Sequence, residues 1–596
     1  MKIQRQKLIF FIFFLISIIT GYLIWDLINL KFENPKIIGQ YSINNYNSAN
    51  DILRYLIFLS LPCTVFILYK FFTQNFFYEI NNFLTSSEES IFDKKKNLLF
   101  FFIAFLILIF FEFLSVEFPI YKVDSYHDGQ KLSAAFKYLT DGSLWSGSYI
   151  TVGIFYETLS SSIFWKFFNH TSIGLARFAD IIYIFIFKIL SILFIYLITK
   201  ISQLELKNKI IFFIFNCIIF LSLIDYSLPT TDNIAFREIP ILILLILFTL
   251  LLTGQKTSIC ILLISILSPT SMLWGVDRGL ICNVLILIIL IYLFLSKRKN
   301  ESILLFLLLS ILWFFLFLYL GEEFKYFINN TYLVYKEMPY VHGIIHPKIF
   351  SDDPNAARAT KTILFILLNL LISINLFFKK KYPINFSKII IFLSFISALS
   401  YLYALGRSDG PHIKNSFGFP LITISIFISY IILKKYIKNL STNQSYLLSG
   451  FMVIFLVINI HFNSNNIFGY IKRFNNFIYL PDSYFLNDNE NKFVDFLKPK
   501  LKNASCVQLF SNDAIFNYVL RKKSCTKYYF VWSAASKINQ NQFITELSKT
   551  NLIITGGEKN NWDYPLEKKL HYVYEHILDK YELNESFNSW SIFIKK

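Results

Sequence analysis

The chain has 596 residues, of which 55% are hydrophobic and 16% are charged, and its mean hydropathy is +0.51. These values exclude a soluble globular protein of this length and indicate a protein that crosses a membrane many times. The formal net charge is +18, but the basic residues are scattered over many short segments, which argues against binding to nucleic acid.

Apolar runs long enough to cross a bilayer recur along the chain. A hydrocarbon core about 30 Å thick needs roughly 20 apolar residues per helix. We therefore predict an α-helical polytopic membrane protein with about thirteen transmembrane helices. The predicted spans are Ile9–Ile28, Ile52–Phe71, Leu98–Phe118, Phe178–Thr199, Ile210–Ile224, Ile239–Leu252, Ser258–Leu273, Leu280–Leu295, Ile303–Leu320, Thr362–Phe378, Ile389–Leu405, Phe417–Leu433 and Tyr446–His461.

The distribution of basic residues predicts how these helices are oriented. Lysine and arginine in short connections are retained in the cytoplasm. Basic runs such as Lys94–Lys96, Lys297–Lys299 and Lys379–Lys381 alternate with connections of a different composition. We therefore expect a multi-pass protein of the inner (plasma) membrane, with its N-terminus in the cytoplasm and, because the helix count is odd, its C-terminus outside.

The chain after the last apolar run has the composition of a soluble domain. We predict a transmembrane module with outward loops over residues 1–461 and a small α/β domain outside the cytoplasm over residues 462–596. The segments "CVQLF", "YYFVW" and "NLIITGG" indicate strands, and "DAIFNYVLRK" and "NQFITELSK" indicate helices. Cys506 and Cys525 are the only cysteines outside the apolar runs, and we expect them to pair in an oxidising compartment, although the sequence alone does not establish the bond.

The first long outward segment contains the sequence "VDSYHDGQK" directly after the third predicted helix. Asp124 and Asp128 are four residues apart, so in a helix they share a face, with His127 beside them. Such a group can serve as a general base. The alternative is that Asp124 caps a surface helix and that the other side chains are only solvated.

The other outward connections combine acids with basic residues, glycine and proline, as polar sites do. Their candidate substrate-binding residues are Arg237 in "DNIAFRE", Asp277 and Arg278 in "WGVDRG", and Arg407, Asp409, His412 and Lys414 in "GRSDGPHIKN". For each of them the alternative is a charge solvated at the interface or a local ion pair that contributes little.

Many helices, an early outward acidic motif followed by an amphipathic segment, and a soluble C-terminal part together resemble the GT-C superfamily of polytopic glycosyltransferases. The architecture matches over nearly the whole chain, but the motif covers only Asp124–Gly129. Motifs of the family are commonly two adjacent acids or D-x-D, whereas here Ser-Tyr-His separates the acids. Which aspartate corresponds to the family's acid therefore stays open.

The resemblance implies transfer of a hexosyl or pentosyl group from a polyprenyl-phosphate donor to a lipid, glycan or protein acceptor at the outer face of the membrane. It requires no cofactor and leaves a divalent metal ion open, for which we assign no ligands. The sugar, the acceptor and the oligomeric state stay undetermined.

Transfer from such a donor needs a base for the acceptor hydroxyl, whereas phosphate leaves without an acid catalyst. We expect Asp128 to be this base and Asp124 to be second, because Gly129 would let the substrate approach the backbone closely. The leaving phosphate needs fixed positive charge, which Arg407 could supply with Asp409 orienting it through a charge-assisted hydrogen bond.

Two further features carry open alternatives. Lys188 lies in the middle of an apolar run, where a charge is costly, and either pairs with an acid such as Glu112 or contacts a substrate. His342 and His346 have the i, i+4 spacing of metal ligands, but the connection 321–361 that holds them could instead cover the active site.

Three other functions compete with a sugar transferase of this kind. An O-antigen ligase or polymerase would share the topology but is usually organised around one large outward loop with arginines. A transporter or flippase of lipid-linked glycans predicts charges inside the bundle and broken helices, for which Lys188 and Pro269 are candidates. A purely structural membrane component would explain the basic runs but not the polar outward connections.

Overall fold

The computed structural model describes residues 2–31, 47–86, 96–222, 234–378, 381–435, 442–459, 464–559 and 565–596. Several positions used above lie outside these ranges, namely Lys94, Lys95, Lys379, Lys380 and the ends Ile224 and His461 of two predicted spans. The protein is a polytopic α-helical membrane protein with a small C-terminal sheet, as the composition predicts.

A helix occupies each predicted span. In chain order these helices are α1 (Lys2–Leu27), α2 (Ser48–Thr73), α4 (Lys96–Ser115), α7 (Ile173–Ile201), α8 (Leu206–Ser222), α9 (Ile234–Leu252), α10 (Thr257–Trp274), α11 (Val276–Leu295), α12 (Lys299–Leu320), α14 (Ala356–Phe377), α15 (Ile384–Ser400), α18 (Gly418–Lys435) and α19 (Thr442–Asn459). Among the described residues, ten segments are long and apolar enough to cross a membrane. That α8, α9 and α19 also cross it remains a prediction.

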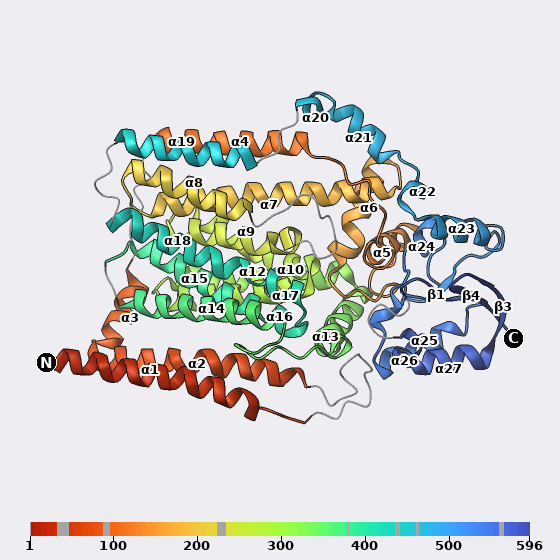
Figure 1. Ribbon diagram of the computed structural model, residues 1–596, viewed down its shortest axis with the longest axis horizontal. Coiled ribbons are helices and arrows are strands. Elements are labelled where there is room, and N and C mark those ends of the chain that lie inside the picture. Colours follow the sequence, from red (N-terminus) through yellow and green to blue (C-terminus); the bar gives the residue numbers. More distant parts are fainter. Residues whose placement is uncertain are drawn as a thin grey trace.

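The long helices lie side by side along the longest axis of the molecule (Figure 1). The α1–α2 hairpin forms one edge of this bundle, and α4 and α19 form the opposite edge. Five helices that occupy none of the predicted spans lie toward the end that carries the C-terminal sheet, namely α5 (His127–Asp141), α6 (Ser160–Phe168), α13 (Glu322–His342), α16 (Leu402–Gly406) and α17 (Gly410–Asn415). The connections predicted to face outward therefore meet at one end of the bundle, while α3 (Phe76–Thr85) lies at the other.

Two features inside the bundle decide between the alternatives left open above. Lys188 of α7 forms an ion pair with Glu112 of α4, with 2.8 Å between Nζ and Oε1. Pro269 lies within α10, which is continuous from Thr257 to Trp274. The lysine thus has a structural partner, and the proline does not break its helix.

The C-terminal part contains a four-stranded sheet in the order β1-β2-β4-β3. The strands are β1 (Gln508–Phe510), β2 (Leu552–Gly556), β3 (Tyr581–Phe587) and β4 (Trp590–Lys595). β1 and β2 pair in parallel, whereas β4 is antiparallel to both β2 and β3. A disulfide joins Cys506 and Cys525, as expected.

One predicted strand is wrong. The segment "YYFVW" does not join the sheet but leads into a short 3-10 helix, Val531–Ser533. Its aromatic side chains are needed elsewhere, because Tyr529, Phe530 and Trp532 pack in one buried cluster with Tyr126 and Phe327. This aromatic run therefore forms a packing surface between the C-terminal part and the segments that hold Tyr126 and Phe327, and not a strand.

The C-terminal part shares a hydrophobic core with the bundle. Phe113 of α4, Trp165 of α6 and Tyr518 lie in one cluster of buried side chains. The indole of Trp165 stacks on the Tyr518 ring with 5.2 Å between ring centroids. A division at residue 462 remains a proposal, since burial runs across it.

We expect a reporter enzyme that is active only outside the cytoplasm to work when it is fused after Lys596 or Asn415 and to fail after Lys299 or Lys381, because basic residues in short connections are retained in the cytoplasm. Reporter activity in whole cells, normalised to the amount of fusion protein, measures this. If the Lys299 fusion were active and the Lys596 fusion inactive, the orientation would be the reverse of the one proposed.

Candidate active site

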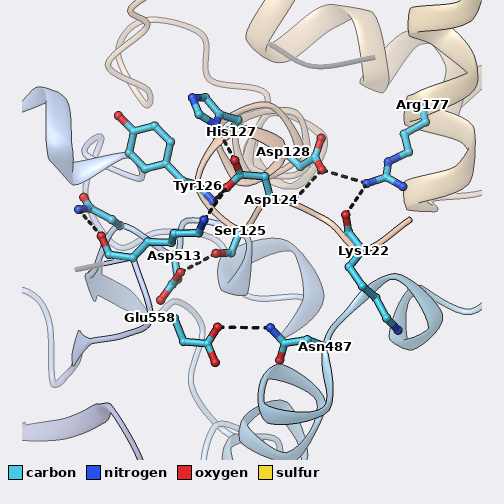
Figure 2. A network of polar contacts seen from close by, with 12 residues as sticks. Lys122, Asp124, Ser125, Tyr126, His127, Asp128, Arg177, Asn487, Asp513 and Glu558 are labelled. Carbon is cyan, nitrogen blue, oxygen red and sulfur yellow. Dashed lines mark hydrogen bonds and ion pairs between the residues drawn. The ribbon is translucent and has the colours of Figure 1, made fainter. Parts of the chain in front are cut away.

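The acidic motif forms a turn that enters α5 (Figure 2). The Asp124 carboxylate accepts a hydrogen bond from the backbone amide of Tyr126 at 3.0 Å and pairs with Nδ1 of His127 at 2.7 Å. The side chains of Asp124 and His127 are 39% and 23% exposed, so both can be reached from outside. A carboxylate placed in this way fixes the orientation and the tautomer of an imidazole.

Asp124 stays ionised at any ordinary pH. Partial burial by itself raises the pKa of this carboxyl, but the hydrogen bond and charge of His127 and the charge of Lys559 lower it to about 2. The Lys559 ammonium, from the C-terminal part, lies 3.9 Å from Asp124 Oδ1.

Asp128 has a different environment. Its Oδ2 accepts hydrogen bonds from Nη2 of Arg177 and from the backbone amide of Asp124, both at 3.1 Å. The Arg177 side chain is only 3% exposed, and its Nη1 also donates to the carbonyls of Pro119 and Tyr121. Asp128 therefore closes the turn and ties it to the start of α7.

Gly129 has a role that differs from the one expected. A Cβ atom at this position would lie 2.3 Å from the backbone nitrogen of Ile515 and 2.8 Å from the carbonyl carbon of Ala514. The space that we assigned to a substrate is thus filled by the backbone of the C-terminal part.

A cavity of about 940 Å³ brings several predicted residues together. One part of its wall is apolar and comes from the membrane helices α10, α11 and α12, with Met272, Val284 and Trp313 among its residues. The polar side chains in its wall include His127, Arg237, Asp277, His342, Tyr403, Arg407 and His412. Residues from the acidic motif and from four later connections therefore share one space.

The connection before α17 is built around Asp409. Its carboxylate accepts a hydrogen bond from Nε of Arg407 at 2.7 Å and one from the backbone amide of His412 at 3.0 Å, and it also meets Nδ1 of the His412 ring. Partial burial raises the pKa of Asp409, but His412 and Arg407 lower it to about 2. Asp409 therefore holds the side chains of Arg407 and His412, which both line the cavity.

His342 reports how positive this part of the cavity is. Burial lowers the pKa of His342 well below its usual range, and the charges of Arg407, His412 and Lys569 lower it further. The ring of His342 packs against Trp532 at 4.7 Å between centroids. A neutral imidazole surrounded by cations marks a place suited to an anion.

Tyr403 contacts the side chains of both Arg237 and Arg278. Nη1 of Arg237 donates to its hydroxyl at 2.8 Å, and the guanidinium of Arg278 lies over its ring, 4.6 Å from the centroid. Arg278 is 2% exposed and binds Glu238 at 2.6 Å and Asp277 at 3.0 Å. Arg278 thus supports the wall from behind, while Arg237 lines the cavity.

Some predicted residues lie apart from this group. Lys414 is exposed on α17, and neither aspartate of the acidic motif is among the described residues that line the cavity. His346 does not join His342, because its Nε2 bonds to the Tyr401 hydroxyl at 2.7 Å. Within the described ranges, no group of three or more His, Cys, Asp and Glu side chains is arranged to hold a metal ion.

Two polar residues of the site were missed. Arg177 stands at the start of an apolar helix with Asp180 three residues later, and such a charge pair at a helix end was a signal that could have been used. Tyr403 is one of 36 tyrosines and carries no distinguishing signal in the sequence.

No protein-family model matches the chain, and no curated protein matches it. Among solved structures it is similar to an oligosaccharyltransferase of Archaeoglobus fulgidus tethered to an acceptor peptide with the NVT sequon, with 12% identity, a TM-score of 0.43 and coverage of 84% of this chain and 74% of that one. It is also similar to ArnT from Cupriavidus metallidurans bound to undecaprenyl phosphate, with 9% identity, a TM-score of 0.41 and coverage of 84% and 98%. Likenesses this distant assign no function, so we base the proposal below on the residues of this chain.

Proposed function

We propose that the chain is a membrane glycosyltransferase that moves a sugar from a polyprenyl-phosphate donor to a lipid, glycan or protein acceptor at the outer face of the inner membrane. One observation carries this proposal. A single cavity combines apolar residues of membrane helices with two arginines and three histidines in its wall. A lipid with an anionic head and a sugar is the ligand class whose chemistry matches both parts.

The donor phosphate would bind at the basic part of the cavity. Arg407 and Arg237 are long enough and fixed enough, by Asp409 and Tyr403, to contact its oxygens. The isoprenoid chain would lie along the apolar residues of α11 and α12. Buried cations that meet the charge developing on the leaving phosphate lower the barrier more than they would in water.

We assign the base to the Asp124–His127 pair. Nδ1 of His127 faces Asp124, so Nε2 is the nitrogen that would take the proton of the acceptor hydroxyl. The acceptor oxygen then bonds to the anomeric carbon, the bond from that carbon to the phosphate oxygen breaks, and its electron pair stays on the phosphate. Asp128, which is held by Arg177, becomes a positioning residue in this scheme.

Transport of a lipid-linked glycan is less well supported. The two features that favoured it were Lys188 and Pro269, and these are accounted for by the pair with Glu112 and by the continuity of α10. Neither of them now points to a moving substrate site inside the bundle.

Substitutions in the motif separate the two aspartates. We expect His127→Ala to lower kcat by about 100-fold or more, as loss of a general base does, and Asp124→Asn to lower it as well, because the amide no longer holds the imidazole. Asp128→Asn should keep most activity, since its remaining oxygen can still accept from Arg177. The measurement is sugar transfer by purified protein from a panel of polyprenyl-phosphate sugars, with thermal unfolding as the control for folding. If Asp128→Asn lost sugar transfer and Asp124→Asn kept it, Asp128 and not His127 would be the base.

Arg407→Ala should raise KM for the donor and lower kcat together, because the guanidinium is proposed to contact the phosphate before and during its departure. A matched control is Arg298→Ala at the opposite end of the bundle. Arg298 also donates through Nε to a carboxylate, at 3.2 Å, and is 25% exposed compared with 21% for Arg407. Equal effects of the two substitutions would contradict a phosphate site at Arg407.

A further inference from the structure

We propose that the C-terminal part positions the catalytic pair through a hydrogen bond from Ser125 to the buried carboxylate of Asp513, and that Asp513 is therefore a positioning residue of the enzyme. The effect that we expect on catalysis rests on the proposed function. Ser125 and Asp513 are 388 residues apart in the sequence, and no sequence pattern links them.

Ser125 is held twice by the same segment. Its hydroxyl donates to Asp513 Oδ1 at 2.5 Å, and its carbonyl accepts from the backbone amide of Ile515 at 3.1 Å. Both side chains of the first bond are buried, with Ser125 3% and Asp513 1% exposed. A buried hydrogen bond between a hydroxyl and a carboxyl group is costly to break, because neither partner can bond to water instead.

Ser125 lies within the turn formed by Asp124–His127, which we call the reactive turn. Asp124 lies on one side of it, and the Tyr126 amide that donates to the Asp124 carboxylate lies on the other. Because both the hydroxyl and the carbonyl of Ser125 are held, the peptide groups before and after it are fixed. The position of the Asp124 carboxylate, and of the His127 ring that it binds, is fixed in turn. Figure 2 shows Asp513 and Ser125 directly beneath this pair.

Asp513 is itself anchored by the sheet. Nε1 of Trp590 in β4 donates to Asp513 Oδ2 at 3.3 Å. Gly557, just after β2, leaves room for this carboxylate, since a Cβ there would lie 2.0 Å from Oδ2. The backbone amide of Lys559 also bonds to Asp513, and the Lys559 side chain returns to Asp124. The carboxylate thus joins the turn to three separate pieces of the C-terminal part.

A second bond in the same interface provides a matched control. The hydroxyl of Ser133 donates to the carbonyl of Ala514 at 2.6 Å and is also buried. Ser133 lies on the face of α5 that contains Gly129 and holds the helix to the C-terminal part, but it does not touch the turn. Loss of this bond weakens docking without changing the fixation of Ser125.

The test compares Ser125→Ala, Ser125→Thr, Asp513→Asn and Ser133→Ala in the full-length protein. We expect Ser125→Ala and Asp513→Asn to lower kcat by about 10-fold or more, as misplacement of a catalytic group does, with KM for the donor within about two-fold of the wild type. Ser125→Thr keeps the hydroxyl and should restore activity, and Ser133→Ala should match the wild type. An equal loss of kcat in Ser133→Ala and Ser125→Ala would overturn the proposal in favour of simple docking.

Hydrogen exchange provides a readout that does not depend on activity. The amides of Asp124 and Tyr126 are bonded within the turn, and we expect them to exchange faster in Ser125→Ala than in the wild type or in Ser133→Ala. Unchanged exchange in Ser125→Ala would overturn the proposal whatever the activity. Faster exchange in a chain whose wild type transfers no sugar would reject the proposed function and leave the positioning of the turn intact.

Discussion

A charge at the end of an apolar bundle is stable only where an opposite charge or several hydrogen-bond partners meet it, and this constraint organises the end of the molecule that holds the cavity. Arg177 meets Asp128, and Lys131 of α5 meets Asp180 of α7. The two pairs hold α5 against α7. The position of the reactive turn is thus a consequence of neutralising four charges near the membrane.

The same constraint explains the basic wall. Arg278 is almost fully buried, and it is tolerated because Glu238 and Asp277 bind it. It stabilises Tyr403, which in turn receives a hydrogen bond from Arg237. The cations that face the cavity therefore rest on a second layer in which charge is already balanced. They are themselves paired, Arg407 with Asp409 and Arg237 with Asp277, so an anionic ligand would share them with these carboxylates.

The sequence predicted the helices well because each depends on a local property. A run of about 20 apolar residues has one stable arrangement in a bilayer, in which its backbone bonds internally. The mixed composition of the connections predicted to face outward also identified several charged residues of the cavity, including Arg407 and His412. These signals need no knowledge of which segments are neighbours.

The parts that could not be predicted depend on distant partners. Asp124 and Asp128 are equivalent by spacing, and distant partners distinguish them: Arg177 of α7 pairs with Asp128, whereas Lys559 lies near Asp124. Gly129 suggests room for a ligand until Ile515 is seen to occupy it. The "YYFVW" run has the composition of a strand, but its rings pack against Tyr126 and Phe327. In each case the decisive contact joins residues far apart in the chain.

The contact between Ser125 and Asp513 also has a consequence for the order of biogenesis. A ribosome makes Ser125 several hundred residues before Trp590, the β4 residue that donates to Asp513. During synthesis the turn is therefore made long before the support that fixes it. Asp513 can hold the turn in its final position only after β4 has been made and has folded, so a chain that stops before Trp590 lacks this support.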